Sequence, residues 1–147
     1  MKIREQVKEF HEAFCAPVLK TPQIPDSARI RLRLKLISEE FFEFLESVID
    51  SKKELRYIRE NVFNTILYKN INVNMPDLAD ALADLDYVVE GTRLEFGING
   101  ESIANEVHRS NMEKIGGEKR YDGKVLKPKN WKPPNIENEL ILQGWKK

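Results

Sequence analysis

The sequence predicts an all-α protein, and three observations support this fold class. Apolar residues recur three or four positions apart over most of the first 116 residues, as they do along one face of an amphipathic helix. No segment alternates apolar and polar residues for long enough to form a strand. Proline, glycine, asparagine and aspartate stand between the periodic segments, where helices begin and end. We expect one domain, 1–147, with a helical core over about 1–116 and a loop-rich tail over 117–147.

The helices are expected in five main segments and one short segment. Their approximate ranges are 1–14, 27–48, 52–70, 76–96, 101–115 and, in the tail, 136–142. Asp26 or Ser27 is suited to cap the second helix, because a short polar side chain can accept a bond from a first-turn N–H. Pro76 suits the first turn of the fourth helix. Gly116 and Gly117 follow the fifth helix, where a glycine is favoured.

The second and fourth helices carry the longest apolar stripes. In the second helix the stripe consists of Ile30, Leu34, Ile37, Phe41, Phe44 and Val48. In the fourth helix it consists of Leu78, Leu82, Leu85, Val89, Thr92 and Phe96. Side chains at this spacing lie on one side of a helix, so we expect the two stripes to be buried faces.

The composition excludes some classes of partner. The chain has 24 basic and 24 acidic residues and a net charge of zero, so no excess of cations is available for nucleic acid or a membrane surface. No apolar run approaches the roughly 18 residues of a membrane span. Cys15 is the single cysteine, which rules out an intramolecular disulfide and fits a cytoplasmic location. We therefore expect no nucleic acid and no membrane among the partners.

Carboxylates border the apolar stripes of both long helices. At about 100° per residue, each of two acidic triplets lies within roughly 60° of arc. The triplets are Glu39, Glu43 and Glu46, with Glu40 displaced toward the apolar face, and Asp77, Asp80 and Asp84. A solvated face explains one such triplet, but aspartate is a poor residue inside a helix and like charges three or four positions apart repel. A bound cation explains both features, and oxygen-only donors suit Mg²⁺, with Mn²⁺ as an alternative.

These motifs resemble those of a known group of enzymes. "EEFFE" (39–43) followed by "DLADALADLDYVVEGT" (77–92) is similar to the E-E-x-x-E and E/D-x-x-D signature of the all-α nucleoside triphosphate pyrophosphohydrolases, the MazG-like and phosphoribosyl-ATP pyrophosphohydrolase-like group. "HRSNMEK" (108–114) and "DGKVLKP" (122–128) also resemble segments of that group. The resemblance covers much of residues 29–134.

The resemblance implies a fold, an activity and a cofactor. The fold is an antiparallel helical bundle of about four to five helices with an irregular C-terminal tail packed on it, usually assembled as a homodimer or homotetramer. The activity is Mg²⁺-dependent cleavage of a nucleoside triphosphate to the monophosphate and pyrophosphate.

By position, the resemblance implies that Glu40, Glu43 and Asp84 are metal ligands. Many members have Glu three residues before that aspartate, where this chain has Ala81, so Asp80, or Asp77 together with Asp80, is the substitute ligand. Glu39 or Glu40 would orient or deprotonate the attacking water.

The remaining candidates are expected to contact the nucleotide. They are His108, Arg109, Asn111, Lys114, Lys124 and Lys127, with Tyr87 as a stacking residue. A structural role is an equal alternative for His108, and packing is the simpler alternative for Tyr87.

Two other classes of function compete with this prediction. A di-iron bundle needs Glu-x-x-His pairs, and neither His11 nor His108 stands three residues after a glutamate. A catalytically inactive nucleotide-binding or protein-interaction module is the stronger alternative, and Ala81 is the residue that favours it. The sequence does not select the base of the nucleotide, because base discrimination depends on hydrogen bonds in the pocket.

Overall fold

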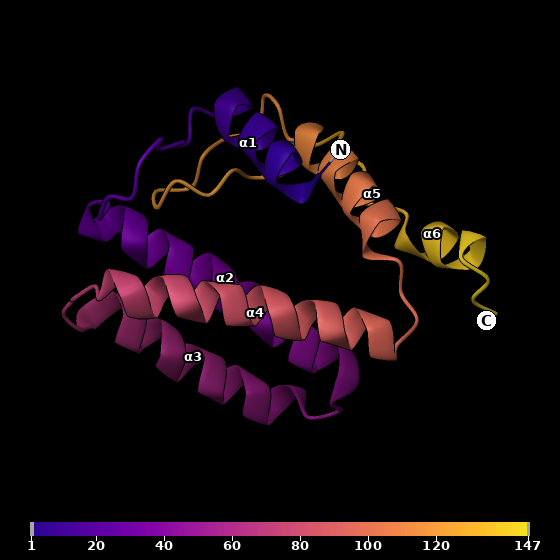
Figure 1. Cartoon of the computed structure of the whole chain (residues 1–147), viewed down its shortest axis with the longest axis horizontal. Helices are drawn as coiled ribbons and strands as arrows, with labels where there is room; N and C mark the ends of the chain where they lie inside the picture. Colours follow the sequence, from indigo (N-terminus) through magenta and orange to yellow (C-terminus); the bar gives the residue numbers. More distant parts are fainter. Residues whose placement is uncertain (1, 147) are drawn as a thin grey trace. The chain divides into compact units, whose positions relative to one another are not determined.

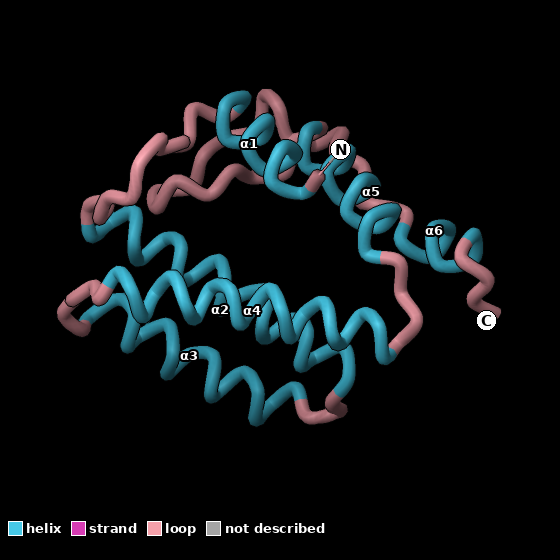
Figure 2. Tube along the Cα trace, in the orientation of Figure 1, coloured by secondary structure: helices cyan, strands magenta, loops and turns pink. Residues whose placement is uncertain are grey.

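The computed structural model describes residues 2–146, and its regular structure is helical (Figures 1 and 2). Within this range the β structure is limited to an isolated antiparallel bridge between Lys119 and Val125. The all-α prediction is therefore confirmed. The helices are α1 (Ile3–Ala13), α2 (Ser27–Val48), α3 (Lys52–Tyr68), α4 (Met75–Glu95), α5 (Gly100–Met112) and α6 (Ile136–Leu142).

The helices begin where short polar side chains cap them. Asp26 accepts a hydrogen bond of 2.8 Å from the Arg29 amide at the start of α2, as predicted. Asn74 caps α4, and Pro76 lies in the first turn of that helix, where its missing N–H costs nothing. The fifth helix ends at Met112, earlier than the sequence predicts, and a turn follows in which the Lys114 amide bonds to an Asn111 carbonyl.

The chain forms two compact units, Gln23–Val73 with Tyr121–Lys124, and Met1–Pro22 with Asn74–Arg120 and Val125–Lys147. In the first, α2 and α3 form an antiparallel hairpin. The Arg31 guanidinium near the start of α2 donates to the Ile66 carbonyl and, at 2.9 Å, to the Lys69 carbonyl at the end of α3. The buried apolar residues of this hairpin are Leu32, Phe42 and Leu55.

In the second unit, α1 runs parallel to α5. Gln6 donates a 2.6 Å hydrogen bond to Asn105, and one turn further along both helices Glu9 lies 3.1 Å from His108. The α6 helix runs antiparallel to α5, since Gln143 contacts Asn99 at the start of α5 and Asn135 contacts Glu106 further along.

The C-terminal tail is attached to this unit by polar contacts. The Lys119 ammonium donates to the Phe14 carbonyl at the end of α1, at 2.6 Å. The Trp131 indole N–H donates to the Ser110 carbonyl at 2.8 Å, and the Ser110 hydroxyl bonds to the Lys132 carbonyl. The irregular tail is thus fixed to α1 and α5.

The predicted apolar stripe of α2 is not the buried face of the helix within the chain. The buried side is formed by Leu32, Glu39 and Phe42, which face α3 and the Tyr121–Lys124 turn. Five members of the predicted stripe are exposed by 39% or more, namely Leu34, Ile37, Phe41, Phe44 and Val48. α2 has apolar residues on two sides, and the hairpin with α3 covers the shorter set, so the predicted stripe is left uncovered within one chain.

The apolar stripe of α4 is also exposed, and this helix contains no buried residue. Its expected burial is therefore not seen within one chain. None of the helices described is long and apolar enough to cross a membrane.

Candidate active site

The carboxylates of "EEFFE" divide into one buried and two exposed groups. Glu39 is 6% exposed and lies on the side of α2 that faces the hairpin interior. Glu40 and Glu43 are exposed. Glu46, one turn further, pairs with Arg59 of α3 at 3.6 Å. Glu40 and Glu43 therefore lie at the surface of the chain, whereas Glu39 is enclosed by protein.

Glu39 is held by the tail turn Tyr121–Lys124. The Lys124 ammonium donates to the Glu39 carboxylate in a close ion pair. One helical turn earlier on α2, the Lys35 ammonium lies 3.5 Å from the Asp122 carboxylate of the same turn. Gly123 has φ +92°, a conformation that suits glycine, and a side chain at this position would meet the Leu32 side chain. The structure thus brings the predicted residues Glu39 and Lys124 together.

The aspartates predicted as metal ligands lie on α4. Asp80 and Asp84 are exposed, and Tyr87, one turn later, is 81% exposed, so it is not a core residue of the chain. They belong to the unit that contains Asn74–Arg120, whereas Glu40 and Glu43 belong to the α2–α3 unit. Across residues 2–146, no group of three or more His, Cys, Asp or Glu side chains is assembled as a cation site. The ligand roles of these four residues stay predictions.

The predicted substrate residues of α5 make contacts within the protein. Lys114 donates a 2.7 Å hydrogen bond to the Asn111 side chain, so these two residues lie together as their spacing predicts. The partly buried His108 lies 3.1 Å from the Glu9 carboxylate of α1. The roles of these residues toward a nucleotide stay predictions.

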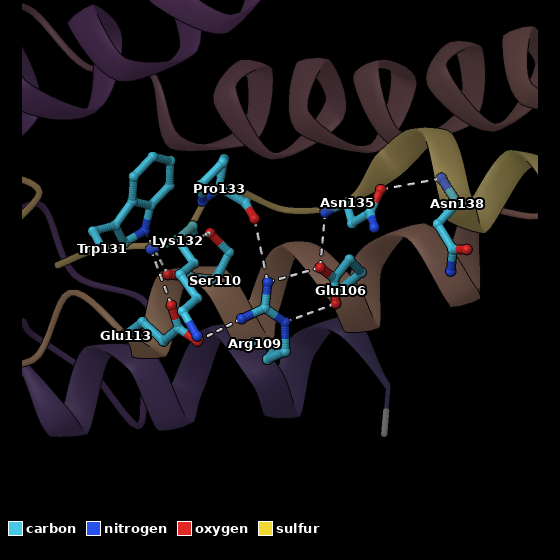
Figure 3. Close-up of polar contacts among 9 residues, drawn as sticks. All are labelled: Glu106, Arg109, Ser110, Glu113, Trp131, Lys132, Pro133, Asn135 and Asn138. Atoms are coloured by element: carbon cyan, nitrogen blue, oxygen red, sulfur yellow. Dashed lines mark hydrogen bonds and ion pairs between the residues drawn. The ribbon is translucent and has the colours of Figure 1, made fainter.

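Arg109 lies at the centre of an ion-pair network between α5 and the tail (Figure 3). Its guanidinium pairs with Glu106 at 2.7 Å and with Glu113 at 2.5 Å, and it donates to the Pro133 carbonyl. Hydrogen bonds from Arg109 and from the Asn135 amide lower the pKa of Glu106 to about 2. The carboxylate of Glu106 in turn raises the pKa of Arg109. The arrangement attaches the segment before α6 to α5.

Lys127 is also in contact with the protein. Its ammonium lies 4.1 Å from the centre of the Trp131 ring, a cation–π arrangement. Its predicted contact with the nucleotide stays a prediction.

Two residues that bear on the site escaped the sequence reasoning. Lys35 and Asp122 form the second ion pair beside Glu39. The charge pattern of the two segments is complementary: Lys35 precedes Glu39 by one helical turn on α2, and Asp122 and Lys124 carry the opposite charges on the turn. A pairing of residues 87 positions apart cannot be read from spacing alone.

A solved structure of a proposed enzyme has the same fold as this chain. A proposed NTP pyrophosphohydrolase from Exiguobacterium sp. 255-15 matches with a TM-score of 0.72 and 26% sequence identity, over 98% of this chain and 96% of that chain. The fold is that of an all-α pyrophosphohydrolase.

The sequence profile of the phosphoribosyl-ATP pyrophosphohydrolase family matches residues 7–111, and the chain belongs to that family. This segment includes the carboxylates of α2 and the aspartates of α4. No curated protein matches the chain.

Proposed function

We propose that the protein is a Mg²⁺-dependent nucleoside triphosphate pyrophosphohydrolase, which cleaves an NTP, a dNTP or a related nucleotide to the monophosphate and pyrophosphate. The observation that carries the proposal is the exposure of Glu40 and Glu43 within the segment that matches the family. Two carboxylates three residues apart on a helix repel each other, and a bound cation would offset this repulsion. The similar Exiguobacterium protein supports the same class of reaction.

The donor chemistry fits magnesium. Glu40 and Glu43 on α2, and Asp80 and Asp84 on α4, supply only oxygen atoms and are all exposed, as a site that retains water and phosphate ligands requires. Glu40 and Glu43 would hold an ion that neutralises the triphosphate and lowers the pKa of a bound water, and the ligand roles of Asp80 and Asp84 stay predictions.

Side chains of the protein would activate the attacking water and bind the phosphate groups. In the reaction a P–O bond forms to water while the α–β anhydride bond breaks, and pyrophosphate leaves with the electron pair of that bond. Glu39 or Glu40 would orient the water and accept its proton. Asn111 and Lys114, already joined by a hydrogen bond, would bind phosphate oxygens.

The test is a substrate panel with matched variants. Purified protein is incubated with Mg²⁺ and each common NTP and dNTP, and monophosphate and pyrophosphate are measured. Glu43→Gln removes one charge from the proposed metal pair and should abolish the activity. Glu46→Gln removes a charge from the next turn, where the partner is Arg59, and should retain it. Diphosphate and free phosphate as products would contradict the proposal.

We also propose that the protein self-associates as a homodimer or homotetramer. The exposed α2 stripe (Leu34, Ile37, Phe41, Phe44 and Val48) is larger than the isolated apolar residues normal on a monomer surface. A second copy of the chain would cover it. Sedimentation velocity at several protein concentrations tests this: a monomer at every concentration would contradict it.

Ala81 favours a second candidate function, a helical module that binds a nucleotide or protein without hydrolysing it. The residue leaves Asp80 as the only acid near Asp84 in the preceding turn. Titration calorimetry with Mg²⁺ and a nucleotide that resists hydrolysis distinguishes the two. Nucleotide binding without any dependence on Mg²⁺, and without turnover of the natural nucleotide, would favour the module.

A further inference from the structure

A cavity of about 340 Å³ lies in the α2–α3 unit, between the first half of α2, the second half of α3 and the turn Tyr121–Lys124. Its wall is mostly apolar and includes Leu32 of α2 with Phe63 and Ile66 of α3. Small-molecule sites have volumes in this range, and they too are mainly apolar with a few polar groups that orient the ligand. The cavity therefore has the size and the lining of a small-molecule site.

The charged groups of the cavity wall already have partners within the protein. Lys35 forms an ion pair with Asp122 at 3.5 Å. The Arg31 guanidinium donates to the carbonyls of Ile66 and Lys69 at the end of α3, where the helix dipole is negative. A phosphate or carboxylate group in the cavity would have to compete with these contacts. The wall therefore favours a neutral ligand.

Two other side chains of the wall, Asn64 and Tyr121, make no hydrogen bond and no ring contact with residues 2–146. The Tyr121 residue is 90% exposed. A tyrosine ring offers a face for stacking, and the amide of Asn64 offers two donors and an acceptor in one plane. A planar ring with donors and acceptors on its edge is complementary to both groups, and nucleobases have this chemistry.

The cavity is separate from the two carboxylates that are proposed to hold the metal. Glu40 and Glu43 are not among the residues that line it. Along α2, the contact of Glu39 with Lys124 lies between Lys35 in the cavity wall and Glu43. A ligand in the cavity therefore need not touch the proposed metal ligands.

We propose that the cavity is a second ligand site, separate from Glu40 and Glu43, which binds the neutral heteroaromatic ring of a nucleoside. The ring would stack on Tyr121 and form hydrogen bonds with Asn64, against the apolar wall that contains Phe63. The inference goes beyond the proposed function, because this binding requires neither Mg²⁺ nor hydrolysis.

The test is an NMR titration of the full chain without Mg²⁺, with adenosine and uridine as probes. Binding in the cavity predicts saturable shifts of the amide resonances of residues 63–67 and 121–122, and smaller changes at residues 40–43. Inorganic phosphate, which has the charge but lacks the ring, should leave the cavity resonances unchanged. No saturable shift at the cavity with either nucleoside, or a larger shift there with phosphate, would overturn the proposal.

Two pairs of variants at exposed residues locate the binding. Asn64→Leu should weaken nucleoside binding about fivefold, the effect of one lost neutral hydrogen bond. Asn61→Leu, its control, changes an exposed asparagine of α3 outside the cavity wall and should bind as the wild type does. Tyr121→Ala removes the stacking ring and should weaken binding about fivefold to a hundredfold, whereas Tyr57→Ala, also exposed and outside the wall, should not. Equal affinities within each pair would overturn the assignment.

The outcomes distinguish failure of this inference from failure of the proposed function. A protein that hydrolyses nucleotides with Mg²⁺, but whose cavity resonances respond to neither nucleoside, would overturn the inference alone. A protein that hydrolyses no nucleotide of the panel, but binds nucleosides in the cavity, would overturn the proposed function alone. Glu43→Gln should retain nucleoside binding, and loss of binding in this variant would contradict the separation of the two sites.

Discussion

Two adjacent phenylalanines of α2 allow a direct comparison of its buried and exposed faces. Phe42 is 3% exposed and packs inside the α2–α3 hairpin, whereas Phe41 is 53% exposed on the apolar stripe. Substitution of a buried phenylalanine by alanine costs about 3–5 kcal/mol, so Phe42→Ala should destabilise the fold by that amount. Full burial of such a side chain contributes about 1.5–3 kcal/mol, of which roughly half is realised at Phe41 in one chain. Phe41→Ala should therefore cost only about 1 kcal/mol in the monomer.

The assay is urea unfolding followed by circular dichroism at two protein concentrations that differ a hundredfold. If a second copy covers the α2 stripe, the wild-type midpoint rises with protein concentration, because association stabilises the folded state by mass action. Phe42→Ala should lower the midpoint at both concentrations. Phe41→Ala should mainly remove the dependence on concentration. Equal destabilisation by the two variants, with the concentration dependence retained, would refute the assignment of the two faces.

Two further predictions concern α5 and the tail. The pKa of Glu106 is lowered from 4.5 to about 2, so its ion pair with Arg109 contributes stability that is present above about pH 4.5 and is lost as the pH falls toward 2. The free energy of unfolding of the wild type should fall over this pH range, and that of Glu106→Gln should change less. The same pH dependence in both proteins would contradict the role given to this ion pair. Gly117→Ala would place a Cβ atom in steric conflict with the Leu126 carbonyl oxygen, so exchange of the Leu126 amide should accelerate. The control Gly91→Ala meets no neighbour in α4 and should leave that exchange unchanged while stabilising the helix by up to about 1 kcal/mol; equal exchange in both variants would contradict the steric argument.

The sequence predicted the helices well because their ends depend on local chemistry. Asp26 caps α2 through a bond to an amide three residues later, and Pro76 fits the first turn of α4 for reasons that involve only its own ring. The fold class follows from the same signals, since period and caps are properties of short segments. The end of α5 was less accurate, because Glu113 and Lys114 favour a helix while the chain turns after Met112.

The buried faces were harder to predict, because burial depends on what packs against a helix. Periodicity identifies the stripe that contains Phe41 as apolar, but it does not say whether the same chain or another covers it. The pairing of Glu39 with Lys124 joins residues 85 positions apart and was equally outside the reach of local pattern. For Arg109 a local signal existed, since Glu106 and Glu113 stand three residues before it and four after it, where helical ion pairs form.

The most direct test of the central claim is the product analysis of the wild type and Glu43→Gln with Mg²⁺ and the panel of nucleotides. The proposed function predicts monophosphate and pyrophosphate in equal amounts from at least one nucleotide, with the activity lost in Glu43→Gln and retained in Glu46→Gln. Release of free phosphate, or full activity in Glu43→Gln, would contradict it.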